Sequence, residues 1–408
     1  MCHARCPAII LYDGGLDVLG VGPVVEDRVT APATIGSFTA PLPALNIVAC
    51  PGLGGRANNP YTWLTHEPMA RLGGTRVSEF SFYRPLPADA QILHVHWPER
   101  IFWGRVSRLH PFLSATFARR MLSAADKIHR RGGFVVWTAH NIMPHESFGA
   151  ARDALWQEYF PTFRSRVDLV ISLSAWAQNE LTAAYPDLLN RRRLVIPHPH
   201  YRTAYPAPPA SEEARRACGL SPEKFMLLAA GTVRLSKGIT ELASLFAQVA
   251  RRDELLVIAG ACSDGGILAQ LNMLAATNSG TVEWRPGRLD DADLPLLIAA
   301  ADLSVFNFRT ILNSGSLIAS LSFNTPVCAP QLGSLRELSA MLGPRWFLPM
   351  PRPLTAEGLR AVIDRAREGR QAGAPREAAP LDALDPEGIA MRICQEYVAL
   401  LDGNREIS

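Results

Sequence analysis

Two segments in the second half of the sequence combine residue types that bind phosphate. The first, residues 231–238, has the sequence Gly-Thr-Val-Arg-Leu-Ser-Lys-Gly and directly follows the apolar run Phe225–Ala230. Arg234 offers phosphate oxygens a bidentate fork, and Lys237 offers a point charge. An ordinary loop with solvated basic residues would have the same composition. Arg234 and Lys237 are therefore candidate ligands of a diphosphate.

The second segment begins an apolar helix expected over residues 315–323. It consists of small or polar residues that leave backbone N–H groups accessible: Asn313, Ser314, Gly315 and Ser316. These N–H groups and the positive end of the helix dipole together bind phosphate. Serine and asparagine are also ordinary helix caps. Because both segments follow predicted strands, we expect them to lie at one edge of a cleft and to share a ligand.

In the first half, ionisable side chains lie in or after two predicted strands, Ile92–Val95 and Phe134–Thr138. They are His94, His96, Glu99, His140, His145 and Glu146. Three interpretations compete: a metal site, histidines held in the core, and substrate binding with acid–base catalysis. The spacing contains no H-x-x-x-H pair of the helical zinc type, and we expect no metal. The other two interpretations stay open at this point.

Two further motifs resemble known ligand sites but have simpler explanations. Asp291-Ala292-Asp293 matches a D-x-D metal motif, yet acids in the first turn of a helix also complement its dipole. Gly52-x-Gly54-x-x-Ala57 matches a dinucleotide-binding fingerprint, yet Pro60 is better suited to begin the following helix. We predict a structural role for the first motif and a flexible Gly-rich lid on the cleft for the second.

The composition excludes several classes of protein. The chain has 408 residues, 48% hydrophobic and 19% charged, which suits a folded protein of about two domains. The 41 Lys and Arg against 38 Asp and Glu leave a net charge of +3, which gives no reason to expect nucleic acid as a partner. Seven scattered cysteines favour a reducing compartment. The sequence has no continuous apolar span of about 20 residues, as a transmembrane helix would need, and no secretory signal pattern at its start. We therefore expect a cytoplasmic protein.

One segment carries more positive charge than the whole chain. Residues 100–131 contain eight basic residues and one acid, a net +7, so the remainder carries −4. Aromatic residues are interleaved with the basic ones. This combination predicts docking on an anionic membrane surface through Arg105, Arg108, Arg119 and Arg120. The alternative is an amphipathic helix with a solvated basic face, and RNA binding fits less well.

Alternating apolar runs and helical stretches predict the elements that hold these residues. Strands are expected at residues 46–50, 76–80, 92–95, 134–138, 169–173 and 194–196, and, after the Pro-rich stretch 197–209, at 225–230, 255–259, 281–284, 303–306 and 327–329. The predicted fold class is α/β, with two Rossmann-like, doubly wound domains facing each other across a cleft. Ligands of such folds bind at the carboxyl ends of the strands.

The order of these motifs resembles the GT-B glycosyltransferases. The resemblance covers about residues 45–400 and includes the Gly-rich loop, the His-x-His and Thr-x-His strand ends, Gly231…Arg234…Lys237-Gly238 and Asn324-Thr325-Pro326-Val327. More narrowly, four motifs look like the bacterial exopolysaccharide transferases related to the xanthan-type β-mannosyltransferase. They are Asn59-Pro60-Tyr61, His96-Trp97-Pro98-Glu99, His140-Asn141…Pro144-His145-Glu146 and Asn313-Ser314-Gly315-Ser316.

This resemblance implies an enzyme that moves a hexose, mannose from the nucleotide sugar GDP-mannose, onto a polyprenyl-diphosphate-linked glycan. The enzyme would be peripheral on the inner face of the plasma membrane. We expect no metal or other cofactor, because Arg234, Lys237 and the N–H groups at Ser314–Ser316 would stabilise the departing diphosphate. The predicted domains are an acceptor domain at 45–200 and a nucleotide-sugar domain at 201–380. An irregular extension at 1–44 precedes them, and a helix and tail at 381–408 follow.

One departure from the family pattern bears on the mechanism. The large retaining GT-B family carries two glutamates separated by seven residues before the Pro-Val strand, where this chain has Ile311 and Ala319. Neither side chain can bind a hydroxyl, which favours an inverting enzyme whose base lies in the first domain. We expect that base to be Glu146, with Glu99 or His145 less favoured, and we expect His140 to contact the sugar.

Three other functions remain open on the sequence. They are a retaining GT-B transferase that uses another sugar nucleotide, a GT-B-fold nucleotide-sugar 2-epimerase, and a non-catalytic sugar-binding protein. An epimerase would share the diphosphate site but would have no use for a basic segment that faces a membrane. A sugar-binding protein would normally be exported.

Overall fold

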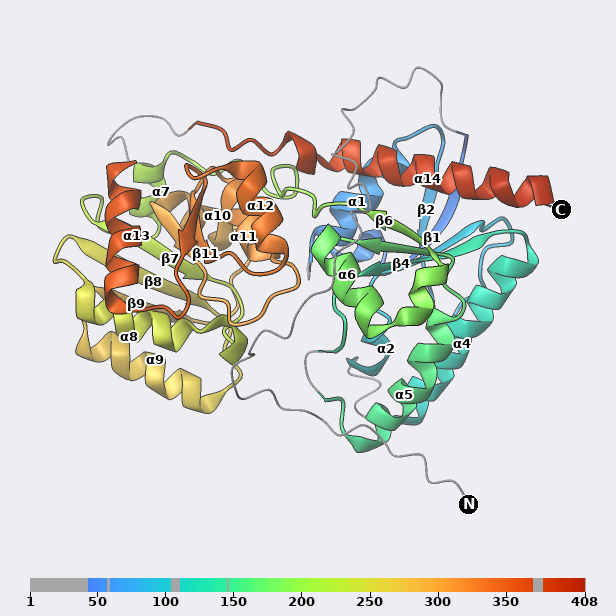
Figure 1. The fold of residues 1–408 in the computed structure, drawn as a ribbon, viewed down its shortest axis with the longest axis horizontal. Helices are drawn as coiled ribbons and strands as arrows, with labels where there is room; N and C mark the ends of the chain where they lie inside the picture. The colour runs from blue at the N-terminus through green and yellow to red at the C-terminus, as the bar shows by residue number, and fades with distance from the viewer. Residues whose placement is uncertain (1–42, 57–58, 104–110, 145–146, 370–376, 408) are drawn as a thin grey trace, which may run out of the picture. The chain divides into compact units, whose positions relative to one another are not determined.

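The computed structural model describes residues 43–56, 59–103, 111–144, 147–369 and 377–407. The irregular extension predicted over residues 1–44 falls almost wholly outside these ranges. Within them the chain forms two parallel β-sheets of six strands each, with helices packed on both (Figure 1). We call each sheet with its helices the first and the second domain.

The first sheet has the strand order β2-β1-β3-β4-β5-β6. Its strands are β1 (Asn46–Cys50), β2 (Arg76–Glu79), β3 (Ile92–Val95), β4 (Phe134–Ala139), β5 (Leu169–Ser172) and β6 (Arg192–Val195). The connecting helices are η1 (Leu53–Gly55), α1 (Tyr61–Ala70), α2 (Arg100–Trp103), α4 (Pro111–Arg130), α5 (Ala150–Arg164), α6 (Ala175–Ala184) and η2 (Pro186–Asn190). Strands β3, β4 and β5 are buried along their whole length, as expected of central parallel strands covered on both faces.

The second sheet has the strand order β12-β11-β10-β7-β8-β9. Its strands are β7 (Phe225–Ala230), β8 (Glu254–Gly260), β9 (Val282–Pro286), β10 (Leu303–Val305), β11 (Val327–Pro330) and β12 (Phe347–Met350). Its helices are α7 (Ser211–Ala217), η3 (Leu235–Lys237), α8 (Ile239–Val249), α9 (Gly265–Thr277), α10 (Asp293–Ala300), α11 (Gly315–Ser322), α12 (Ser334–Leu342), α13 (Ala356–Glu368) and η4 (Asp382–Leu384). Both sheets are therefore of the doubly wound type that the sequence predicts.

The last helix, α14 (Pro386–Ile407), follows the second domain in the chain but packs against the first (Figure 1). Its side chains Ile393 and Tyr397 share a buried cluster with Ile92 of β3 and Phe134 of β4. The Tyr397 hydroxyl also lies 2.9 Å from Nδ1 of His94. Helix α14 thus completes the core against β3, the strand that contains His94 and is followed by His96.

A carboxylate of the second domain caps a helix of the first. Glu337 of α12 accepts hydrogen bonds from the backbone N–H groups of Ala175 (3.1 Å) and Trp176 (2.7 Å), at the start of α6. A negative charge at this position complements the helix dipole. Gly333, just before α12, has φ +49°, and a Cβ there would lie 2.7 Å from the Trp176 ring. Glycine therefore permits this close contact between the domains.

Each of the predicted strands is present, with ends that differ by at most two residues. Pro60 directly precedes α1, as expected. Strand β12 and helices α12 and α13 were not predicted from the sequence. Strand β12 has only four residues and includes Pro349, which normally argues against a strand. It is tolerated here because β12 lies at the edge of the sheet and pairs only with β11 among the described strands.

Candidate active site

The two predicted phosphate-binding segments meet at Gly231, directly after β7. A Cβ at this glycine would lie 3.0 Å from Oγ of Ser316 and 3.2 Å from Nζ of Lys237. Gly231 also has φ +114°, a conformation that favours glycine. The turn therefore needs a residue without a side chain, because an ammonium group and a hydroxyl group lie directly beside it.

The Lys237 ammonium group lies in an environment that favours an anion. Burial, and then the charge of Arg234, lower the pKa of Lys237 to about 8. Within the described residues Lys237 forms no salt bridge with a carboxylate, so no protein anion offsets this cost there. Arg234, three residues earlier in the loop between β7 and η3, is exposed. A partly desolvated cation beside a second cation is an arrangement typical of ligand sites.

The N-terminus of α11 borders the same space. The Ser314 hydroxyl accepts the N–H of Leu317 (3.2 Å) and so caps the helix. The Asn313 side-chain amide nitrogen is buried and has no hydrogen-bond partner among the described residues. A Cβ at Gly315 would lie 2.7 Å from the Tyr201 hydroxyl. The helix start is thus in close contact with the segment that follows β6, and Asn313 has a donor left for a ligand.

Aromatic rings connect this helix start to the first domain. The position of a Gly315 Cβ would be 3.5 Å from Nε2 of His198, and the His198 ring lies 4.9 Å from that of Tyr61. Tyr61 in turn meets His140 edge-on at 4.5 Å. Trp97 stacks on the His140 ring, with ring centroids 4.1 Å apart and an interplanar angle of 20°. His140 is therefore only two rings away from the candidate phosphate site.

His140 belongs to a network of buried histidines. Its Nε2 lies 3.3 Å from Nδ1 of His96, and Nε2 of His96 lies 2.7 Å from Nε2 of His66. His94 lies beside them and bonds Thr138 through Nε2 (2.8 Å) and the Tyr397 hydroxyl through Nδ1. Burial lowers the pKa of each of these four histidines, to about 3 for His66. They are uncharged at neutral pH.

Sequence reasoning missed two members of this site, His66 and His198. His66 lies on α1 and reaches His96 only because α1 packs at the carboxyl end of β3, a tertiary contact with no short-range signal in the sequence. His198 lies in the Pro-rich stretch after β6, which contains no helix or strand. That stretch also supplies Tyr201, so a Pro-rich segment without helix or strand carries residues of the site.

The histidine network does not have the geometry of a zinc site. One ring nitrogen from each of His66, His94 and His96 lies within 4.8 Å of the other two, a spacing that could hold a metal ion. Both nitrogens of His94 already have hydrogen-bond partners. The 2.7 Å between the Nε2 atoms of His66 and His96 is shorter than the separation of about 3.3 Å that two ligands of a tetrahedral zinc require. These atoms form a hydrogen-bonded network, and the absence of a metal stays a prediction.

The candidate carboxylates lie in different surroundings. Glu99 is partly buried, and its Oε1 accepts a hydrogen bond from the Asn141 amide (3.2 Å). Burial raises the pKa of Glu99. A cavity of about 10 Å³, the size of one water molecule, lies between Glu99 and the Trp137 ring. His145 and Glu146 lie outside the described residues, so the structure does not place the expected base.

The two motifs with simpler explanations have visible structural roles. In the motif Asp291-Ala292-Asp293, Asp293 lies in the first turn of α10, and the N–H groups of Ala292 and Asp293 are accepted by the preceding Asp290 (both 2.9 Å). In the Gly-rich loop, Glu79 accepts the N–H groups of Gly52 (3.0 Å) and Gly54 (3.2 Å). Because Glu79 occupies these donors, they do not hold a pyrophosphate in this conformation. Ala57 lies outside the described residues.

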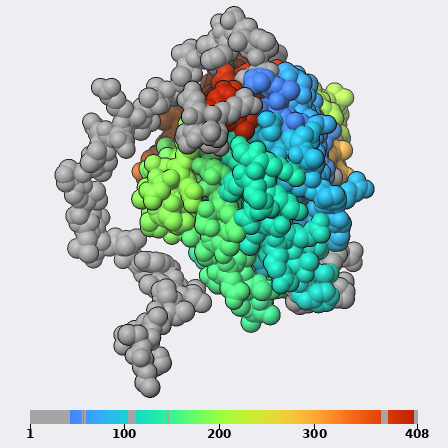
Figure 2. Space-filling view, turned by 90° about the vertical axis from the view of Figure 1, so that its right-hand side faces the viewer, coloured from blue at the N-terminus to red at the C-terminus, as the bar shows by residue number. Residues whose placement is uncertain are grey.

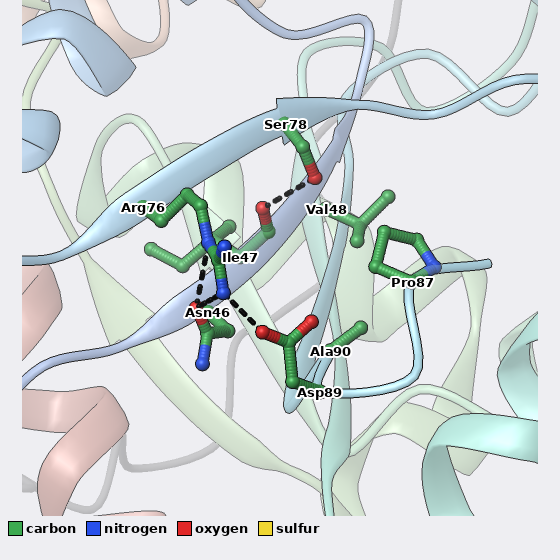
Figure 3. Close-up of a pocket in the computed structure, with 8 residues that line it drawn as sticks. All are labelled: Asn46, Ile47, Val48, Arg76, Ser78, Pro87, Asp89 and Ala90. Atoms are coloured by element: carbon green, nitrogen blue, oxygen red, sulfur yellow. Dashed lines mark hydrogen bonds and ion pairs between the residues drawn. The ribbon is translucent and has the colours of Figure 1, made fainter.

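A cavity of about 230 Å³ lies away from this site (Figure 3). It is lined by the first residues of β1 and β2 and by the loop before β3, so it lies at the amino ends of the strands. Arg76 there bonds Asn46 and Asp89, which accounts for the charged groups at its mouth. The carboxyl ends of the strands, where the histidines and Lys237 lie, are the better candidate.

The basic segment is described in part. Arg105 and Arg108 lie outside the described residues. Arg119 and Arg120 are exposed on α4, which lies at the surface of the first domain (Figure 2, teal). Phe112, on the first turn of α4, is 66% exposed. None of the helices in the described part of the chain combines the length and apolar character that a membrane crossing requires.

The chain is similar to known proteins both in sequence and in fold. No family model matches the chain. A GDP-mannose:glycolipid 4-beta-D-mannosyltransferase of Xanthomonas campestris pv. campestris is 26% identical over 329 residues, 79% of this chain and 82% of the relative.

Several solved structures share the fold. Sucrose-phosphate synthase from Thermosynechococcus elongatus superposes with a TM-score of 0.57 at 16% identity, covering 88% of this chain and 100% of that one. The catalytic domain of starch synthase IV from Arabidopsis thaliana, bound to ADP and acarbose, gives 0.57 at 12% identity, with 90% and 99% coverage. Anabaena HepE in complex with UDP-glucose gives 0.51 at 14%, with 89% and 99% coverage.

The two parallel sheets and these neighbours define the GT-B fold, and the chain is a glycosyltransferase. Within that class it is similar to the xanthomonad GDP-mannose:glycolipid mannosyltransferase over about four-fifths of its length. The predicted fold class, enzyme class and family resemblance are confirmed.

Lys237 leads to a prediction about alkaline pH. With a pKa of about 8, the free protein loses this cation between pH 7 and 9. We expect the affinity for a nucleoside diphosphate such as GDP to fall about tenfold over this range, and to be low and nearly constant in K237Q. Titration calorimetry measures both. K127Q, at an exposed lysine of α4, should keep the wild-type profile, whereas a flat wild-type profile would contradict the assignment.

The buried histidines lead to a prediction about mild acid. The pKa of His66 is about 3 and that of His198 about 4, against 6.5 in the unfolded chain. Below pH 6.5 the unfolded chain therefore binds more protons, and the free energy of unfolding falls by about 2 kcal/mol per histidine by pH 5. Denaturant titrations at pH 7.5, 6 and 5 measure this loss.

His129 acts in the opposite sense and provides a control. Its hydrogen bond to Asp168 (2.8 Å) raises the pKa of His129, so its contribution is fully present below pH 6.5 and is lost as pH rises through the raised value. H129Q should therefore make the loss in acid larger. Stability that stays constant from pH 7.5 to 5 would show that the histidines are not buried in the neutral form.

Proposed function

We propose that the protein transfers mannose from GDP-mannose to a lipid-linked oligosaccharide, with inversion of configuration. The observation that carries this proposal is that Lys237 and Ser316 meet at Gly231. The rings of His198 and Tyr61 connect this position to His140. A diphosphate held there would place its sugar toward the first domain. The name of the xanthomonad relative supports the choice of sugar nucleotide and acceptor class.

In this proposal the second domain stabilises the leaving group. Lys237, Arg234 and the N–H groups at the start of α11 bind the diphosphate, whose negative charge grows as the bond between the sugar C1 and the phosphate oxygen breaks. Because these groups are fixed before the reaction, they need little rearrangement in the transition state. Their positive charge supplies what a divalent cation would otherwise provide, and we therefore propose no metal.

The first domain would supply the proton acceptor. As the acceptor oxygen bonds to C1, its proton passes to a carboxylate on the opposite side from the leaving group. Ala319 is buried on α11 and Ile311 lies before it, so neither family glutamate position holds a carboxylate. We assign the base to Glu146. Glu99 is less suited because its carboxylate is already bonded to Asn141.

The name of the relative also supports inversion. It describes a β-linked product formed from GDP-mannose, a sugar nucleotide whose mannose is α-linked. A retaining enzyme would give the α product, and an epimerase would convert the sugar nucleotide without any acceptor. The identity of the product and its dependence on acceptor thus separate the three activities.

The decisive experiment offers radiolabelled GDP-mannose and UDP-glucose to the purified protein with lipid-linked oligosaccharides extracted from bacterial membranes. We expect transfer from GDP-mannose only, a β linkage by NMR, and a turnover at least about 100-fold lower in E146Q. E158Q, at an exposed glutamate of α5, is the matched control and should behave as wild type. A turnover of E146Q close to that of wild type would reject Glu146 as the base.

We also propose that the enzyme docks on the inner face of a bacterial plasma membrane, where an acceptor for exopolysaccharide assembly would be found. Arg119 and Arg120 are exposed on α4, and Phe112 exposes its ring at the start of the same helix. Tyr83 is 74% exposed, and its ring lies 5.7 Å from that of Phe117 on α4. Cations with exposed rings suit the boundary between anionic headgroups and acyl chains.

Vesicle flotation tests this docking. Wild-type protein should float with vesicles rich in phosphatidylglycerol and should be released at 1 M salt, since roughly this concentration screens charges beyond a few ångströms. Neutralising Arg105, Arg108, Arg119 and Arg120 to Gln should abolish flotation. The same change at four exposed arginines elsewhere (Arg193, Arg216, Arg252 and Arg336) is the matched control. Flotation that neither salt nor the first variant weakens would contradict electrostatic docking.

A further inference from the structure

We infer that His66 and His96 are positioning residues that fix His140 in the neutral tautomer with its proton on Nδ1. Nδ1 is the nitrogen that this network leaves for a ligand. What Nδ1–H meets rests on the proposed function, but the tautomer itself does not.

The three imidazoles form an unbranched line of hydrogen bonds. His66 contacts His96 through the two Nε2 atoms at 2.7 Å, and His96 contacts Nε2 of His140 through Nδ1 at 3.3 Å. His66 and His96 are 0% and 1% exposed, whereas His140 is only partly buried. The line therefore runs from the protein interior to the side of the site that faces the second domain.

In such a line one proton position determines all the others. A neutral imidazole has one N–H donor and one acceptor nitrogen. If His66 donates from Nε2, His96 must accept at Nε2 and donate from Nδ1, and His140 must accept at Nε2 and carry its proton on Nδ1. If His66 accepts, every proton moves to the other nitrogen. Burial keeps all three rings neutral, because it lowers the pKa of each well below 6.5.

The inner end of the line selects between these two arrangements. Nδ1 of His66 is buried and has no hydrogen-bond partner among the described residues. In the first arrangement this nitrogen keeps a lone pair, and in the second it carries an N–H group with nothing to bond. Unpaired buried N–H groups are rarer in proteins than under-satisfied acceptors. The first arrangement is therefore favoured, and His140 presents an N–H donor.

The rings beside His140 hold its plane in place. Trp97 stacks on it at 4.1 Å, and Tyr61 meets it edge-on at 4.5 Å with an interplanar angle of 90°. A rotated ring would lose the bond to His96. Because Nδ1 then carries a proton, His140 cannot remove one from an acceptor hydroxyl. It donates a hydrogen bond to an oxygen of the sugar nucleotide, and the base must be another residue.

Nitrogen NMR of the full chain, labelled with ¹⁵N-histidine and without substrate, tests this directly. Long-range ¹H–¹⁵N correlations distinguish the two neutral tautomers and the protonated ring. At pH 7.5 we expect the Nδ1–H tautomer for His96 and His140 and the Nε2–H tautomer for His66. An Nε2–H tautomer or a protonated ring at His140 would overturn the inference.

Two substitutions of His66 separate positioning from simple support of the fold. The amide nitrogen of glutamine in H66Q can donate where Nε2 does, whereas leucine in H66L cannot. We expect H66L to give mixed tautomers at His140 and a kcat about tenfold lower with KM for the acceptor unchanged, and H66Q to restore both. H129Q alters a histidine outside the line and should change neither.

A folded H66L protein in which His140 keeps a single Nδ1–H tautomer would overturn the role of His66. If H66L does not fold, H66Q and the wild-type spectrum still decide the question. Because the spectra need no substrate, correct tautomers without mannose transfer would count against the proposed function and leave this inference standing.

Discussion

The site depends on a cation that the fold keeps partly out of water. Lys237 lies against Gly231 and Ser316, where burial and Arg234 lower its pKa to about 8, a cost that a bound anion would offset. A turn with positive φ at Gly231 brings the Lys237 ammonium group and the Ser316 hydroxyl at the start of α11 close to the same backbone atoms. The sheet of the second domain holds both segments, since β7 leads into one and the loop after β10 into the other.

The histidines that the first domain brings to this site are uncharged. His96 directly follows β3 and His140 directly follows β4, and α1 adds His66; burial keeps all three histidines neutral. Positive histidines here would bind a diphosphate themselves and compete with Lys237. Neutral rings with fixed donors can instead orient the sugar. Positive charge on one side and oriented neutral groups on the other would direct the leaving group and the sugar to opposite domains.

Much of this arrangement was predictable because it is local. Apolar runs gave the strands to within two residues, and the carboxyl ends of parallel strands must share an edge, which brought Lys237 toward Ser316. His66 and His198 could not be found this way, because their roles come from the packing of α1 and the path of a Pro-rich segment. Strand β12 was missed because Pro349 is tolerated only at a sheet edge, and topology alone reveals that edge.

The central claim is that the second domain holds a diphosphate by its own positive groups, and a calorimetric comparison of GDP with guanosine in EDTA tests it most directly. Each charge-assisted contact contributes about 1.5–3 kcal/mol, so two or more of them predict GDP binding at least about 100-fold tighter than guanosine. Equal affinities, or GDP binding that appears only when a divalent cation is added, would contradict the account.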